Sequence, residues 1–277
     1  MNSPDEGFNW QRQFYEKMPL KTRQELLSAE RIFPYEVVGQ NEPADNYARN
    51  LRHLAQFYWT KFIYERVHGM GNLGDLERAE HLLDLAIRKI GAAFYLLNDM
   101  GNIHLEYYKL YAKSLSQHTG LDPVELSRAQ DRARRCFEDS IVVQRHQLRA
   151  YFNLAYVEAE LSPHASRVQS LRKAIADLRE GLKHPNWERA PIPDQTCGAL
   201  YNLGCYYARL APNDPKAESA CVAVLRKAAR LGLISPLEVE RDFHSKDGDF
   251  NAILKGARPE TRSILGKLEK DLGRHYR

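Results

Sequence analysis

The chain has 277 residues, of which 43% are hydrophobic and 27% charged, a composition typical of folded globular proteins and unlike that of disordered chains. Its 40 basic and 36 acidic side chains leave a formal net charge of +4, which permits a nucleic-acid partner without demanding one. No stretch approaches the roughly 20 apolar residues that cross a bilayer, and the polar N-terminus lacks a secretory signal pattern, so we expect a cytoplasmic protein without membrane contact.

Residues 1–43 differ from the rest of the chain because they contain four prolines with aromatic residues between them. Trp10, Phe14 and Met18 follow one another at helical spacing, which predicts a short helix with one apolar face. We expect this segment to be an N-terminal docking arm. Its expected role is a cap on the first repeat, and the alternatives are an autoinhibitory segment in the protein's own groove or a helix that recruits a partner.

Apolar residues recur at helical spacing through the rest of the chain, and no segment shows the sustained alternation of a strand. Clear helix starts occur at Asp122-Pro123 and Ser235-Pro236, where an N-cap residue precedes a proline at the first helical position. The pattern predicts an all-α protein with helices at about residues 44–68, 75–90, 92–117, 122–143, 146–161, 165–182, 195–210, 215–231 and 259–272.

One helical phrase recurs in the chain: residues 151–156 read YFNLAY, and residues 200–207 read LYNLGCYY. In both copies an Asn precedes a Leu, and a small residue follows that Leu. Each copy is followed by a second helix with a large apolar residue between two small ones, at Ala174, Leu178 and Gly181 and at Cys221, Leu225 and Ala228. Weaker copies lie upstream, at Leu51–Tyr58 with Ala79, Leu83 and Ala86, and at Met100-Gly101 with Ala133, Phe137 and Ser140.

These phrases resemble the two helices of the tetratricopeptide repeat, in which a small residue lets the second helix approach closely. The resemblance implies a right-handed α-solenoid of about four TPR-like helical hairpins. The array is divergent, because the anchors Leu54, Met100, Leu154 and Leu203 are 46, 54 and 49 residues apart rather than about 34. We expect residues 1–43 to form the arm, 44–234 the repeat array and 235–277 a set of C-terminal capping helices.

The resemblance also implies a binding groove. In tetratricopeptide proteins the residue before the Leu of the first helix faces the concave side, where an amide can both donate to and accept from a peptide backbone. Asn153 and Asn202 match this position, and Asp99 and His53 stand at the equivalent places of the earlier repeats. Neighbouring groove positions are predicted to be Arg149, Phe152, Tyr156, Tyr201 and Arg209. The alternative is structural, since Asn can bond to an adjacent helix and Tyr often packs between helices.

A second candidate surface is basic. Arg128, Arg132 and Arg135 share one face of a predicted helix and form a basic stripe that could meet phosphate or an acidic partner. Acidic residues are interleaved with it, at Glu125, Asp131, Glu138 and Asp139, so an ordinary solvated face is the alternative. The densest aromatic cluster, residues 57–64, is expected in a core rather than stacked on bases.

No catalytic, nucleotide-binding or metalloprotease motif occurs in the chain, and the histidines lack the spacing of helical metal ligands, so we expect neither an enzyme nor a cofactor or metal. The four cysteines form no CxxC pair and are expected to be reduced core thiols, although Cys205 and Cys221 could lie close across one hairpin. Asp242, Asp247 and Asp249 lie near Gly248 but miss the EF-hand spacing, and helix capping is their expected role.

The sequence therefore predicts a non-catalytic scaffold or adaptor that binds a peptide segment or helix of another protein in its groove. The alternative is an RNA-binding or other nucleic-acid-binding repeat protein that uses the basic stripe. A homo-oligomer is left open, because an exposed terminal hairpin can pair with a copy of itself.

Overall fold

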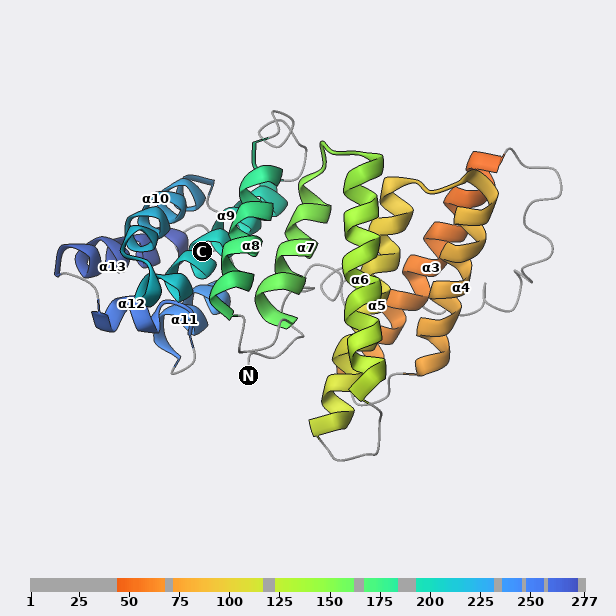
Figure 1. Ribbon diagram of the computed structural model, residues 1–277, viewed down its shortest axis with the longest axis horizontal. Coiled ribbons are helices and arrows are strands. Elements are labelled where there is room, and N and C mark those ends of the chain that lie inside the picture. The colour runs from red at the N-terminus through yellow and green to blue at the C-terminus, as the bar shows by residue number, and fades with distance from the viewer. Residues whose placement is uncertain are drawn as a thin grey trace. The chain divides into compact units, whose positions relative to one another are not determined.

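The computed structural model describes most of the chain after the N-terminal arm, and every element it describes is a helix (Figure 1). The predicted arm, residues 1–43, lies outside the described residues. No strand occurs among the residues described, and none of the helices there is long and apolar enough to cross a membrane. The described residues are 44–67, 72–116, 123–161, 167–183, 193–231, 236–245, 248–256 and 259–273.

The chain divides between Val143 and Gln144 into two compact units. The helices of the first unit are α3 (Ala44–Val67), α4 (Leu73–Ile90), α5 (Phe94–Ser116) and α6 (Pro123–Val143). Local chemistry sets their ends: the Asn72 side chain caps α4 by accepting from the Gly74 amide at 3.0 Å, and Gly91 ends that helix at φ 82°.

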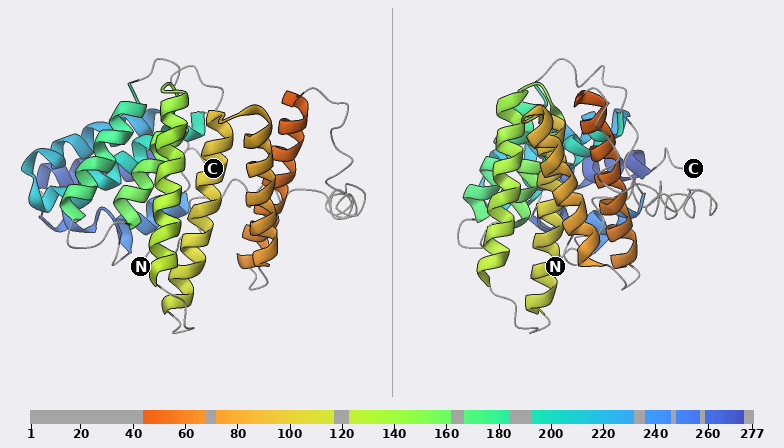
Figure 2. Two further views of the ribbon diagram at one scale, coloured as in Figure 1. Left: turned by 45° about the vertical axis from the view of Figure 1, so that its right-hand side comes forward. Right: turned by 90° about the vertical axis from the view of Figure 1, so that its right-hand side faces the viewer.

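In the first unit α3 packs against α4, and α5 against α6, as two helical hairpins (Figure 2). Their apolar faces share one core that contains Trp59 and Phe62 of α3 and Leu96 of α5. The prediction that the aromatic cluster is a core feature is confirmed for Tyr58, Trp59 and Phe62, which are at most 4% exposed. The hairpins are therefore held together by apolar burial.

A close approach fixes the α5–α6 hairpin. A Cβ placed on Gly101 of α5 would lie 2.5 Å from Cε1 of Phe137 on α6, so only glycine leaves room for that ring. Phe137 is fully buried, and Ser140 one turn later donates a hydrogen bond to the Phe94 carbonyl at 2.7 Å. The small-against-large pairing expected from the repeated phrase is present in this hairpin.

The second unit contains seven helices and a short 3-10 turn among its described residues. They are α7 (Leu148–Leu161), α8 (Arg167–Gly181), α9 (Pro193–Leu210), η4 (Ala211–Asn213), α10 (Pro215–Leu231), α11 (Pro236–His244), α12 (Asn251–Gly256) and α13 (Pro259–Gly273). The bounds of α7 to α10 and of α13, like those of the first unit, lie close to the ones predicted from apolar spacing.

The hairpins of the second unit repeat the same packing. A Cβ on Gly204 of α9 would lie 2.7 Å from Cδ2 of Leu225 on α10, and one on Gly181 at the end of α8 would lie 2.7 Å from the Tyr151 Cβ near the start of α7. The end of α8 therefore meets the start of α7, which makes these two helices antiparallel.

The last three helices cover the end of this hairpin stack. Phe243 of α11, Phe250 before α12 and Leu265 of α13 are at most 4% exposed and share a core with Leu225 of α10. The rings of Phe243 and Phe250 pack in a tilted arrangement with centroids 4.4 Å apart. The C-terminal helices pack on this unit through burial of aromatic and aliphatic side chains.

Candidate functional site

The side chains expected to read a peptide lie mainly on α7 and α9 of the second unit. On α7, Arg149, Asn153, Tyr156 and Glu160 recur every three or four residues and therefore share one face. Arg149 and Tyr156 are partly exposed and Glu160 is exposed, whereas Asn153 is only 9% exposed. Asn153 thus lies at the base of this face rather than at its outer surface.

An ion pair joins the C-terminal ends of α7 and α9. Arg209 of α9 donates through Nη1 to the Glu160 carboxylate and through Nη2 to the Ala159 carbonyl, the latter at 3.2 Å. Since both partners lie near the last residues of their helices, α7 and α9 run in the same direction. This pair anchors the two helices to one another.

The ion pair also relates the positions of Asn153 on α7 and Asn202 on α9 along their helices. Asn153 precedes Glu160 by seven residues, and Asn202 precedes Arg209 by the same number, so each lies about two turns back on the same side of its helix. The two amides are therefore brought to matching heights on neighbouring helices. Asn202 is partly exposed and is the more accessible of the two.

We call this surface the α7/α9 face and define it by its partly or fully exposed members. They are Arg149, Phe152, Tyr156, Glu160 and Asn202. Phe152 also packs against the core beneath, which holds the rim of the face in place. The predicted groove residue Arg209 is 10% exposed and acts here as the tie between helices.

Tyr201, also predicted in the groove, is a core residue. It is 3% exposed, its hydroxyl donates to Asp242 Oδ2 at 3.1 Å, and its ring meets Phe250 edge-on at 5.9 Å between centroids. The physical reason is helical geometry. Tyr201 directly precedes Asn202, so its side chain points about 100° away from that of Asn202, toward the C-terminal helices. Tyr201 thus lies in the core beneath the α7/α9 face.

Asp99, the equivalent position in the first unit, is likewise internal. It is 1% exposed, and its Oδ2 accepts from Arg52 Nε at 2.7 Å and from Gln56 Nε2 at 2.9 Å, both on α3. His53, beside Arg52, is exposed. Asp99 therefore links α3 to α5 by a charge-assisted hydrogen bond and offers no surface of its own to a ligand.

A second buried carboxylate, that of Glu106, also links α5 to α3. Glu106 of α5 is fully buried, and its two oxygens lie 2.9 Å from Arg66 Nη1 and 2.8 Å from Lys109 Nζ. Asp75 of α4 is also fully buried and pairs with Lys61 at 3.0 Å. Local periodicity gave no sign of the pairs Arg66–Glu106 and Lys61–Asp75, because the members of each come from different helices.

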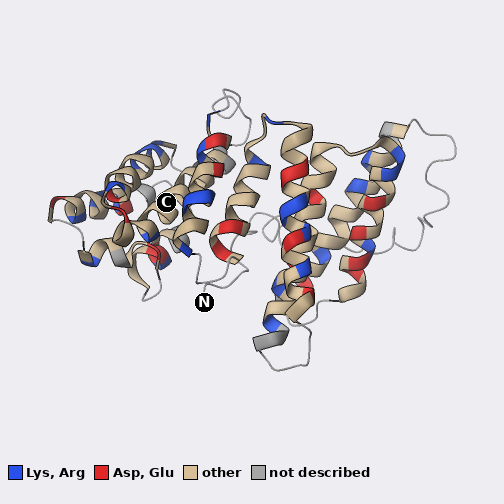
Figure 3. Cartoon of the chain, viewed as in Figure 1, with Lys and Arg blue, Asp and Glu red and all other residues tan. Residues whose placement is uncertain are grey.

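The basic stripe lies on α6, where its three arginines are exposed. Arg128 pairs with Glu125, and the neighbouring Arg134 pairs with Asp131 at 2.9 Å. The helix carries four basic and four acidic side chains, which alternate along it (Figure 3). Its charges balance, so this face resembles an ordinary solvated helix more than a polyanion site.

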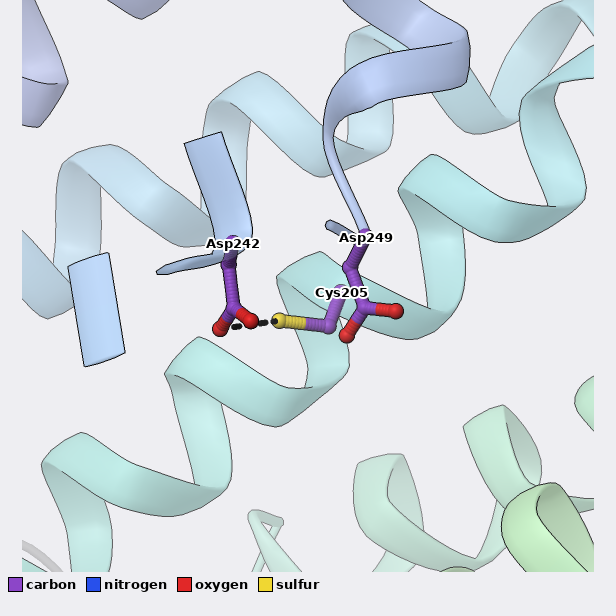
Figure 4. A group of neighbouring side chains, drawn as sticks. All are labelled: Cys205, Asp242 and Asp249. Atoms are coloured by element: carbon purple, nitrogen blue, oxygen red, sulfur yellow. Dashed lines mark hydrogen bonds between the residues drawn. The ribbon is translucent and has the colours of Figure 1, made fainter. Parts of the chain in front are cut away.

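One thiol and two carboxylates come together beneath the C-terminal helices (Figure 4). A ligand atom from each of Cys205, Asp242 and Asp249 lies within 4.8 Å of the others, and Cys205 Sγ is 3.9 Å from Asp242 Oδ2. Burial raises the pKa of Asp249 to about 6 and raises that of the Cys205 thiol well above its ordinary value. The trio is the cation-binding candidate among the described residues.

Two arginines already balance the charge of this trio. Arg241 donates through Nε to Asp242 Oδ1 at 2.7 Å, and Arg209 Nε lies 3.9 Å from Asp249 Oδ1. A cation would have to displace these partners and deprotonate a thiol whose pKa burial raises. The arrangement fits a structural tie between α9 and α11 better than a metal centre.

The expected capping role is therefore wrong for Asp242. It lies within α11, is 1% exposed and accepts hydrogen bonds from Tyr201 on α9 and from Arg241. Asp247 lies outside the described residues. Cys205 and Cys221 are buried free thiols, as expected of a core, and Cys136 is free and partly buried.

Comparison with known proteins adds no family. No protein-family model matches the chain, and no curated protein matches it either.

Proposed function

We propose that this chain is a non-catalytic scaffold or adaptor that binds an extended peptide segment or helix of another protein along the α7/α9 face. We further propose that its hairpins are TPR-like units of the right-handed α-solenoid class. The observation that carries the binding proposal is the partly exposed Asn202 amide on α9 together with the partly exposed rings of Phe152 and Tyr156 on α7, two helices that the Arg209–Glu160 pair ties together.

The chemistry of the α7/α9 face suits a peptide. The Asn202 amide can donate to a carbonyl and accept from an N–H group, which an extended backbone presents together. Phe152 and Tyr156 supply the flat, rigid contact area that dominates many protein interfaces. Arg149 adds a cation that favours a partner carrying an acidic side chain near this point.

The experiment is a selection of peptides from a random library displayed against the full chain, followed by affinity measurements on the selected sequences. We expect Asn202→Ala and Tyr156→Ala each to weaken binding by about tenfold or more, the equivalent of about 1.4 kcal/mol. Asn213→Ala removes an exposed amide from η4 and is the matched control, which should leave affinity unchanged.

Far-ultraviolet circular dichroism and thermal unfolding verify that each variant keeps its fold. The proposal fails if no peptide is enriched, or if the selected peptides bind the Asn202 and Tyr156 variants as tightly as the unmodified chain. Photo-crosslinking of a selected peptide locates the contact independently, and labelling confined to the first unit would also contradict the proposal.

A further inference from the structure

The strongest charge imbalance in the described chain lies on α8 and α10 rather than on the basic stripe of α6. The exposed charged side chains of these two helices are all basic. They are Arg167, Arg172, Lys173 and Arg179 on α8, and Lys216, Arg226, Lys227 and Arg230 on α10. We call this surface the α8/α10 basic face.

The acidic side chains of the same helices are partly buried or already accept hydrogen bonds from other residues. Asp177, Glu180 and Glu218 are each only partly exposed. Glu180 accepts from Arg145 at 3.0 Å and from Lys183 at 2.8 Å, and Glu218 accepts from the Thr261 hydroxyl. The acidic side chains therefore cancel little of the outward positive charge.

Four arginines of this face pair with none of the described residues. Lys173 pairs with Glu158, but no ion pair or side-chain hydrogen bond to a described residue occurs at Arg172, Arg179, Arg226 or Arg230. These four guanidinium groups are exposed, always charged, and shaped to bind phosphate oxygens. On α6, by contrast, the charges of Arg128 and Arg134 are paired within their own helix.

The two helices lie on a common support. Both α8 and α10 pack against α9, and Ala217 and Val224 of α10 join the apolar cluster that Leu171 and Ile175 of α8 help to form. Their buried sides thus converge on one core. Both helices carry blue Lys and Arg segments in Figure 3.

The residues between the cations indicate what kind of partner fits. The exposed positions there are Gln169, Ala176, Ser219 and Ala223, which are small or polar, and the exposed large apolar side chain of these helices, Leu231, lies at the last residue of α10. A protein partner would need apolar or aromatic anchors at the centre of the contact, and a single strand would need aromatic rings for base stacking. The exposed side chains of these two helices include no aromatic ring.

We propose that the α8/α10 basic face binds the phosphate backbone of double-stranded nucleic acid without reading its sequence. Arg172 and Arg179 are seven residues apart, so about 10.5 Å of helix separates them, and the α10 cations extend the contact to a second helix. The ligand is recognised by its line of phosphates, which these guanidinium groups neutralise with release of counterions.

The test is fluorescence anisotropy with the full chain and a labelled duplex of about 20 base pairs, between about 50 mM and about 200 mM salt. We expect the logarithm of affinity to fall with the logarithm of salt by about 0.9 for each phosphate contacted. The triple variant Arg172→Gln, Arg179→Gln, Arg226→Gln should lower that slope by about 3, whereas Arg→Lys at the same positions should retain it.

The matched control removes the same number of charges from the basic stripe, as Arg128→Gln, Arg132→Gln, Arg135→Gln, and should leave binding unchanged. The proposal is overturned if the duplex does not bind at low salt, or if both triple variants lose affinity equally. Tighter binding of a single strand of equal length, or displacement of the duplex by polyglutamate at equal charge, would overturn it as well.

Discussion

Gly101 of α5 lies against the ring of Phe137 of α6, so closely that a Cβ at residue 101 would be 2.5 Å from Cε1. The same relationship holds between Gly204 of α9 and Leu225 of α10, at 2.7 Å from Cδ2. Both glycines follow the anchor residue of the repeated phrase. A single missing side chain thus sets how near two helices come in each compact unit.

Replacing Gly204 by Ala should destabilise the second unit by about 1–3 kcal/mol, because the new methyl group overlaps the buried Leu225 side chain. Gly198→Ala in the same helix is the control. No atom lies within 4 Å of a Cβ there, so alanine should raise stability by up to about 1 kcal/mol through its helix propensity. Urea unfolding followed by circular dichroism measures both changes in stability. Changes of the same sign in the two variants would contradict this packing.

The Glu106 carboxylate should be a main support of the first unit, because it neutralises Arg66 and Lys109 inside the protein. Glu106→Gln keeps the shape but removes the charge, and it should cost about 3 kcal/mol. Asp84→Asn breaks the exposed pair with Arg88 on α4 and should cost less than about 1 kcal/mol. Equal losses in urea unfolding would show that the burial of Glu106 has no energetic consequence.

His104 should make the protein less stable in mild acid. Burial, aided by the charge of Arg132 on α6, lowers its pKa from 6.5 to about 4, and Glu80 of α4 at 4.0 Å is too distant to reverse this. Because the unfolded imidazole binds its proton first as pH falls, stability present above pH 6.5 is lost toward pH 4. The loss amounts to about 3 kcal/mol.

The measurement for His104 is urea unfolding of the unmodified chain and of His104→Gln at pH 7 and pH 4.5. The stability difference between the two proteins should shift by about 2–3 kcal/mol toward the variant at the lower pH. Every other titrating group is common to both proteins and cancels in that comparison. A difference that does not change with pH would mean that His104 titrates normally.

Asp249 should show the opposite pH dependence. Burial raises its pKa from 3.8 to about 6 in spite of Arg209, so the folded protein keeps this proton when the unfolded chain has released it. Stability is therefore lost as pH rises from about 4 to about 6. Asp249→Asn should stabilise the protein by up to about 3 kcal/mol at pH 7 and have little effect near pH 4.

The neighbouring Asp242 is the control for that substitution. Its carboxylate accepts from Tyr201 and from Arg241, so Asp242→Asn should destabilise the protein at pH 7 by about 2 kcal/mol. Thermal or urea unfolding of both variants at pH 4 and pH 7 checks the two signs. If Asp249→Asn destabilises at pH 7, the Arg209 contact outweighs the cost of burying that charge.

The sequence by itself determined where the helices lie and which small residues let neighbouring helices pack closely. Apolar spacing and N-caps are local, so the bounds of α3 to α10 and the small residues Gly101, Gly181 and Gly204 could be recognised from the order of residues alone. Burial of the predicted aromatic cluster followed for the same reason. A helix with one apolar side has few ways to remove it from water.

Only the tertiary structure decided which polar side chains face outward. Arg52 and Asp99 lie 47 positions apart, and Tyr201 and Asp242 lie 41 apart, so their bonds depend on the register between helices. A rotation of about 100° separates buried Tyr201 from accessible Asn202, although they are neighbours in the chain. The spacing of apolar residues within a helix does not predict that register, because the packing of whole helices against one another sets it.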